Sequence, residues 1–149
     1  MRKLVIAVLL AASPQVVSSQ EACTYDRCAL RVEMRNIVAG SQGIEKYPLR
    51  LFSTPRLEDR LAISDSALAH YRVFTSNHVS ANVWNLVGGS LLAFGMVDSI
   101  SDADVMSTEV GIGVTVVGVI ASLIGTNKTR KAQNGLARAI WWYNRELPR

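Results

Sequence analysis

Apolar residues gather in a few long stretches of this chain rather than being spread along it. Two of these stretches, residues 83–97 and 110–125, contain no charged side chain. Each continues, away from the other, into a polar stretch without proline, and an acidic segment, residues 98–109, separates them. Because the stretches are long and contain no proline, the pattern predicts an antiparallel helical hairpin over residues 64–145.

Capping residues stand at both expected helix starts. Ser64 or Asp65 can cap the first helix, and Ser107 or Thr108 can cap the second. The two arms would have about 34 and 37 residues, and each would be about 50 Å long at 1.5 Å per residue. Their apolar halves would lie beside the acidic tip, and their polar halves beside the N-terminal part of the chain.

The segment before the hairpin, residues 20–62, has the character of short strands. Residues 29–34 alternate apolar and charged side chains, which is typical of a half-exposed strand. Gly40 and Gly43 indicate a turn, and Pro48 limits the segment after them to a sheet edge or a break. The prediction is a mainly α fold: a long antiparallel two-helix hairpin with a small N-terminal β-rich cap of two or three strands. This cap is too small to hold a large core of its own.

Glycine and alanine recur every seven residues in both arms. Away from the tip, the two series read Gly95, Gly88, Ala81, Phe74, Ala67 and Gly111, Gly118, Gly125, Ala132, Ala139. A seven-residue repeat keeps one stripe of each helix facing its partner. Paired in this order, the residue numbers add to 206 throughout, and small residues oppose small ones except at Phe74. The spacing therefore predicts close approach of the two backbones.

Two environments fit the apolar halves of the hairpin. Residues 110–125 have no polar face beyond Thr115 and Ser122, whereas a surface helix of a soluble protein should have one. This favours insertion into a membrane. A soluble antiparallel coiled coil is the alternative, because the apolar runs are shorter than the ~20 residues of a spanning helix. Asn85 and Ser90 also interrupt the first run.

The N-terminal residues 1–19 are typical of an export signal. Arg2 and Lys3 precede a short apolar run, Pro14 follows it, and cleavage is expected after Ser19. The apolar run is too short to span a bilayer. A buried N-terminal helix is the alternative interpretation.

The chain has two cysteines, Cys23 and Cys28, which closely follow the predicted cleavage site. Four residues between them can close a small loop, and an exported protein meets an oxidising compartment in which a disulfide persists. The spacing therefore predicts a structural disulfide, with free thiols or metal ligation as the alternatives.

The charges raise a conflict about orientation. If the signal is cleaved and the hairpin spans an inner membrane, the acidic tip lies inside and the basic residues 128–131 lie outside. This contradicts the positive-inside rule. The conflict disappears if the hairpin enters an outer membrane from the periplasm, if residues 1–19 are no signal, or if the hairpin does not span. An exported envelope protein is favoured, with the choice of membrane open.

Motifs for catalysis and for nucleotide binding are absent from the sequence. His70 and His78 are too few to complete a metal site, and the acidic tip lacks the glycine and glutamate of a calcium loop. The net charge of +4 is too small to indicate nucleic acid. We therefore expect no enzymatic activity, no catalytic residue, no metal and no cofactor, and the sequence identifies no small-molecule substrate.

Trp141 and Trp142 stand near arginines close to the end of the chain. Aromatic side chains beside arginines suit a membrane interface. A continuous helix, however, places them about 24 Å beyond Gly125. We therefore expect Ile140 and Tyr143 to pack on the first arm.

The hairpin resembles the glycine-zipper two-helix segments of small bacterial envelope proteins. The residues that carry the resemblance are Gly88, Gly89, Gly95, Gly111, Gly113, Gly118 and Gly125. The chain departs from the lipoprotein members, because Cys23 lacks a lipobox and the glycines are seven rather than four apart. The resemblance implies an oligomeric envelope protein without enzymatic activity.

The predicted function is that of an exported, membrane-associated envelope protein with a structural or scaffolding role. Its expected partners are the lipid bilayer and further copies of the same chain. One alternative is a pore-forming or transport-accessory oligomer with a polar stripe through Asn85, Ser90, Thr115 and Ser122. A second alternative is a soluble periplasmic interaction protein.

Overall fold

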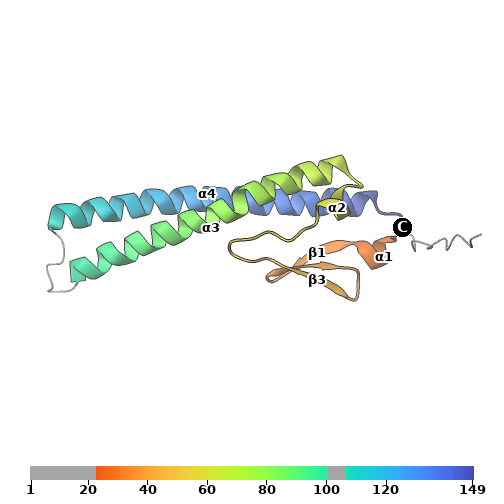
Figure 1. The fold of residues 1–149 in the computed structure, drawn as a ribbon, viewed down its shortest axis with the longest axis horizontal. Helices are drawn as coiled ribbons and strands as arrows, with labels where there is room; N and C mark the ends of the chain where they lie inside the picture. The colour runs from red at the N-terminus through yellow and green to blue at the C-terminus, as the bar shows by residue number, and fades with distance from the viewer. Residues whose placement is uncertain (1–22, 101–106) are drawn as a thin grey trace, which may run out of the picture.

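The computed structural model of the chain describes residues 23–100 and 107–149. Its elements, in chain order, are α1 (Tyr25–Cys28), β1 (Leu30–Glu33), β2 (Asn36–Ala39), β3 (Glu45–Pro48), α2 (Glu58–Leu61), α3 (Asp65–Ile100) and α4 (Thr108–Glu146). Figure 1 shows α3 and α4 side by side, with the sheet packed against the end of the hairpin that carries the C-terminus. The predicted fold, a long helical hairpin with a small β-rich cap, is confirmed.

The first long helix extends further toward the tip than the sequence pattern predicts, whereas the second begins where it was expected. Asp98 lies in α3, although it falls in the expected connection. Neither glycine nor proline follows Gly95 before Ile100, so nothing in the sequence ends α3 at Val97. The predicted export signal and the tip residues Asp102 and Asp104 lie outside the described residues.

Both expected helix starts are in place. Ser64 precedes α3, and its hydroxyl accepts a hydrogen bond from the Ala67 backbone N–H at 3.3 Å. Ser107 precedes α4, and its backbone carbonyl accepts from the N–H groups of Val110 and Gly111. These are the first bonds of the helix itself, and the Ser107 side chain forms no capping hydrogen bond, so the expected side-chain cap of α4 is not formed.

The cap contains a three-stranded antiparallel sheet in the order β1-β2-β3. Gly40 and Gly43, in the turn between β2 and β3, have positive φ angles of 76° and 64°. Pro48 is the last residue of the edge strand β3, where its missing N–H costs no ladder bond. The turn between β1 and β2 was not predicted. It contains Met34 at a φ of 52°, and methionine is not a typical turn residue.

The cap and the polar half of the hairpin share one hydrophobic core. Leu30, Ile37 and Leu61 from the cap are at most 2% exposed and pack in one cluster with the helix residues Tyr71 and Tyr143. Burial of Tyr143 confirms that this end of α4 packs on the first arm. The cap therefore depends on the hairpin for its core, as its small size predicts.

The side chain of Asn144 in α4 binds the free edge of β1. Its Oδ1 accepts from the Leu30 N–H at 2.7 Å, and its Nδ2 donates to the Leu30 carbonyl at 2.8 Å. The amide thus replaces the strand that would otherwise pair with this edge. Nearby, the Tyr25 N–H donates to the Pro148 carbonyl at 2.9 Å, which joins α1 to the end of the chain.

Arg60 in α2 connects the cap to α4. It donates to the hydroxyls of Tyr47, at 2.7 Å, and Tyr143, at 3.3 Å, and it forms an ion pair with Glu45. Hydrogen bonds from Tyr47 and Arg60 hold the pKa of Glu45 below its ordinary value. Burial alone would lower the pKa of Arg60, but the bonds to Glu45 and Tyr143 outweigh it and raise the pKa. The pair is therefore charged at neutral pH.

Cys23 and Cys28 form a disulfide, with 5.6 Å between their Cα atoms. The bridge encloses the single turn of α1 and confirms the predicted pairing. Cys28 is buried in the shared core, whereas Cys23 is exposed. The bridge therefore attaches the start of the described chain to the cap.

Replacement of Asn144 by alanine should loosen the cap. The Leu30 N–H and carbonyl would lose their partners in a partly buried position, which costs about 2 kcal/mol. We expect thermal unfolding, followed by near-ultraviolet circular dichroism in detergent, to occur at a lower temperature. Asn134→Ala is the matched control, because Asn134 lies exposed on the same helix. Equal effects of the two substitutions would contradict a role of the Asn144 amide as a strand mimic.

Candidate functional site: the glycine-lined seam

The seam between α3 and α4 is lined by the small residues that recur every seven positions. All ten positions of the two series are buried: Ala67, Phe74, Ala81, Gly88 and Gly95 on α3, and Gly111, Gly118, Gly125, Ala132 and Ala139 on α4. The seam thus continues from the shared core at one end into the apolar half of the hairpin at the other.

At the central glycines the two helix backbones approach so closely that no side chain would fit. A Cβ atom added to Gly88 would lie 2.6 Å from the Ser122 nitrogen and 2.9 Å from the Gly118 oxygen. A Cβ atom on Gly118 would lie 2.9 Å from the Leu92 nitrogen, and one on Gly125 would lie 2.8 Å from the Asn85 nitrogen. These are contacts with backbone atoms, which cannot rotate away as a side chain can.

The contacts differ in one respect from the expected pairing of glycine with glycine. Gly88 does lie next to Gly118, but it is inserted between Gly118 and Ser122, one turn further along. Likewise, Gly125 meets Asn85 rather than Ala81. The reason is that packed helices interdigitate, so a small residue occupies the groove between two turns of its partner. Equal residue-number sums identify the correct stripe and the contact of Gly88 with Gly118, but the nearest neighbours, Ser122 for Gly88 and Asn85 for Gly125, lie about one turn further along.

Polar side chains in the seam satisfy their hydrogen bonds within the hairpin. Thr115 Oγ1 donates to the Gly111 carbonyl at 2.9 Å, and Thr129 Oγ1 donates to the Gly125 carbonyl at 2.9 Å. Asn85 Nδ2 donates across the seam to Thr129 Oγ1 at 3.1 Å. Bonds of this kind make polar side chains tolerable in an environment without water.

The four residues of the polar stripe expected for a pore do not share one surface of the hairpin. Asn85, Thr115 and Ser122 lie against Gly125, Gly95 and Gly88 of the facing helix. Asn85 and Ser90 are exposed, and of these two only Asn85 lies against a glycine of the seam. Three of the four side chains therefore contribute to packing between the arms of one hairpin.

A second column of small residues in the seam was missed from the sequence. Ala121 is 2% exposed, and a Cβ atom on Gly135 would lie 2.9 Å from the Phe74 nitrogen. Each stands three positions after a member of the predicted series, Gly118 and Ala132. Alternating spacings of three and four residues are the known signature of a packed helix pair and could have revealed both.

Two further glycines face away from the seam. A Cβ atom added to Gly89 or to Gly113 would meet nothing within 4 Å. Glycine inside a helix costs about 1 kcal/mol relative to alanine. Packing within the hairpin does not compensate for this cost at either position.

His78 and the aromatic pair near the C-terminus have structural surroundings. The ring of His78 is 2.7 Å from the Arg50 carbonyl and stacks near Phe74 at a centroid distance of 5.0 Å. Arg145 lies over both Trp141 and Trp142, at 5.3 and 5.2 Å from the ring centroids. Among the described residues, His, Cys, Asp and Glu do not form a group of three that could bind a metal.

Replacement of Gly118 by leucine should separate the two arms of the hairpin. The new side chain would collide with the Leu92 backbone, so the helices must move apart by about 2 Å, toward the upper end of the usual ~8–10 Å interaxial distance. Spin labels on cysteines introduced at the outward-facing residues Leu86 and Leu123 would report the change by pulsed electron paramagnetic resonance.

Gly113→Leu is the control for this experiment, because the substitution is the same and the helix is the same, but the space around Gly113 is open. We expect it to leave the distance between the labels unchanged. An unaltered distance in the Gly118→Leu variant would show that the seam is not closely packed.

Comparison of the chain with models of protein families, with characterised proteins and with solved structures found no match. The resemblance of the hairpin to glycine-zipper envelope proteins therefore stays a prediction from residue types and spacing.

Proposed function

We propose that this chain is a non-enzymatic membrane protein of the cell envelope. The apolar half of its hairpin is embedded in a bilayer, and its cap lies in an oxidising compartment outside the cytoplasm. Its role is structural: the hairpin anchors the cap and associates with further copies of itself.

The observation that carries this proposal is the outer surface of the apolar half. Most of its large apolar side chains are between 37% and 65% exposed. They are Val83, Trp84, Leu86, Val87, Phe94, Met96 and Val97 on α3, and Val110, Ile112, Val116, Val117, Val119, Ile120, Leu123 and Ile124 on α4. Soluble monomers rarely expose a continuous apolar patch of more than a few hundred Å².

The low burial of these helices separates them from the core helices of a soluble protein. Both are long and apolar enough to cross a membrane, yet only 17% and 22% of the residues in their most apolar windows are buried. A core helix would have its apolar side chains covered by other elements. Here the seam uses the small residues and leaves the large ones outside, which is the arrangement that suits lipid.

The depth available also suits a bilayer. From Val83 to the end of α3 at Ile100 the helix is about 27 Å long, and from the start of α4 to Asn127 it is about 30 Å long. The hydrocarbon core of a typical bilayer is about 30 Å thick. The hairpin can therefore reach from one headgroup layer to the other with Asp98 and Glu109 close to the far side.

The location of the cap is supported by the disulfide between Cys23 and Cys28, because such bonds persist in oxidising compartments and are rare in the cytosol. The absence of enzymatic activity is proposed because two side chains of types used in catalysis have structural partners. His78 binds the Arg50 carbonyl, and Ser64 caps α3.

Membrane insertion predicts that the protein stays in the membrane fraction after an alkaline carbonate wash and is released only by detergent. Cysteines introduced at Ser107, near the tip, and at Lys131 should react from opposite sides of sealed vesicles with a membrane-impermeant thiol reagent. Cys23 and Cys28 do not interfere while they are oxidised. Release by carbonate would contradict insertion, and labelling of both positions from one side would contradict a span.

Self-association predicts that copies of the protein cross-link in membranes through the faces that carry Gly89 and Gly113. Gly113→Leu should reduce the yield of cross-linked dimer several-fold, because the large side chain prevents close approach of a second helix. Trp141→Leu, an exposed position distant from the apolar half, is the control. An unchanged yield in the Gly113→Leu variant would exclude this face as the contact.

A further inference from the structure

We propose that a turn of the cap and a group of basic residues on α4 form a second membrane contact, which binds the phospholipid headgroup layer where the hairpin enters the bilayer. This inference rests on the proposed insertion of the hairpin. It adds a specific partner, the phosphate groups and outer acyl region of phospholipids, and a specific surface of the cap.

The turn consists of Arg50, Leu51, Phe52 and Ser53, between β3 and α2. Arg50 and Ser53 form a β-bridge, so Leu51 and Phe52 occupy the tip. Their side chains are 62% and 57% exposed. Turn tips normally carry glycine, proline, asparagine or aspartate, so two large apolar residues at this place need a partner outside the chain.

The turn is fixed to α3 at the end of the apolar half. Asn82 Nδ2 donates to the Leu51 carbonyl at 2.6 Å, and the His78 ring lies 2.7 Å from the Arg50 carbonyl. Asn82 directly precedes Val83, the first residue of the apolar half. Figure 1 shows the connection between β3 and α2 reaching along α3 toward the middle of the hairpin.

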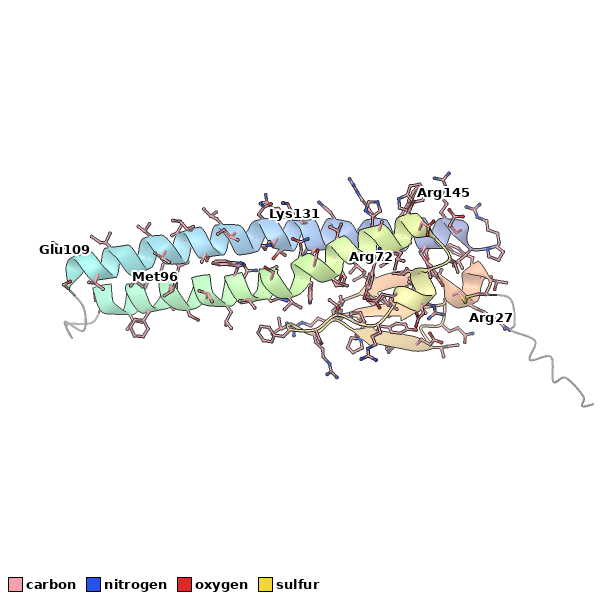
Figure 2. All side chains as sticks on the ribbon, turned by 45° about the horizontal axis from the view of Figure 1, so that its top comes forward. Arg27, Arg72, Met96, Glu109, Lys131 and Arg145 are labelled. Atoms are coloured by element: carbon pink, nitrogen blue, oxygen red, sulfur yellow. A yellow bond between two sulfur atoms is a disulfide. The ribbon has the colours of Figure 1, made fainter. Side chains whose placement is uncertain are left out.

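Basic residues of α4 lie at the same depth as this turn. The bond between Asn85 and Thr129 sets the register, so Asn82 is level with residues 128–132 of α4. Lys128, Arg130 and Lys131 follow within about 9 Å of Gly125, where the apolar half of α4 ends. Figure 2 shows Lys131 on the side of the hairpin away from the cap.

The basic residues Lys128, Arg130 and Lys131 have no acidic residue near them on either long helix. The chain has no aspartate or glutamate from Val110 to Arg145 or from Ser66 to Val97. In the described part of the chain, ion pairs are formed by Arg31 and by Arg60, and neither involves Lys128, Arg130 or Lys131. Cations at this depth match the phosphates of a headgroup layer, which is about 5–8 Å thick on each side of the hydrocarbon.

The two features therefore meet one lipid layer from opposite sides of the hairpin. Leu51 and Phe52 insert shallowly into the boundary between headgroups and acyl chains, as apolar residues of interfacial elements do. Lys128, Arg130 and Lys131 bind phosphates. We assign phospholipid as the partner because both features begin where the lipid-facing surface of the hairpin ends.

The test places a fluorophore that senses water on single cysteines of the full-length, oxidised protein. The protein is reconstituted into vesicles of phosphatidylcholine and phosphatidylglycerol. Phe52→Cys reports the turn, Ile44→Cys reports an exposed cap position, and Leu123→Cys reports the hairpin; Ile44 is 82% exposed. Far-ultraviolet circular dichroism checks that each variant is folded.

We expect lipids brominated near the headgroup to quench the label at residue 52 at least twofold more than the label at residue 44. If residue 123 is quenched by deeply brominated lipid while residue 52 behaves like residue 44, the hairpin is inserted but the second contact does not exist. If residue 123 is not quenched, the proposed function itself fails. The two failures are therefore distinguishable.

The basic residues are tested by the triple variant Lys128→Gln, Arg130→Gln, Lys131→Gln. Its preference for vesicles with phosphatidylglycerol over vesicles of phosphatidylcholine alone should fall by about fivefold for each charge removed, at low salt. Arg72→Gln, Arg138→Gln, Arg145→Gln removes equal charge further from the bilayer and should change this preference much less. Equal losses in both variants would overturn the assignment of phosphate binding to Lys128, Arg130 and Lys131.

Discussion

The close approach of the α3 and α4 backbones is the contact on which the rest of the structure depends. It is made by glycines. Because they lack a side chain, backbone atoms of the facing helix lie where a Cβ atom of Gly88 or Gly118 would be. Because small residues occupy the seam, the large apolar side chains are left for other surfaces. In the polar half they meet the cap, and in the apolar half they remain exposed. One stripe of residues thus determines both what is buried and what is presented outward.

The cap depends on the hairpin more than the hairpin depends on the cap. The cap residues Leu30 and Ile37 are buried in a cluster to which α3 and α4 contribute, among others, Tyr71 and Tyr143. Asn144 supplies the hydrogen bonds of a missing strand. The apolar half needs no such partner, since its contacts lie between its own two arms. This division explains how one short chain can contain a compact part with a shared core and an elongated apolar part.

Sequence periodicity was sufficient to predict the hairpin and the stripe of buried small residues, and the short gap between the two cysteines of an expected exported chain predicted the disulfide. Periodicity was insufficient where tertiary packing decides. Gly125 meets Asn85, one turn away from the expected Ala81, because the two helix surfaces interdigitate. The positions of small residues in the sequence do not reveal this shift. The roles of Asn144 and His78 were hidden for a different reason. Each binds a backbone carbonyl that is distant in sequence, and carbonyls carry no residue signature.

The position of the cap turn also bears on the conflict between the export signal and the basic residues of α4. The bond between Asn82 and the Leu51 carbonyl places the cap at the same end of the apolar half as Lys128 and Lys131. If the disulfide marks this side as oxidising, the basic residues lie outside the cytoplasm, against the bias that orients helices in an inner membrane. That bias acts during insertion from the cytoplasm. A hairpin that enters a membrane from the periplasmic side, with its basic residues remaining on the side of entry, meets no such constraint. Under the proposed function, the cap and the basic residues lie on one side of the membrane, which is the arrangement expected for entry from the periplasm.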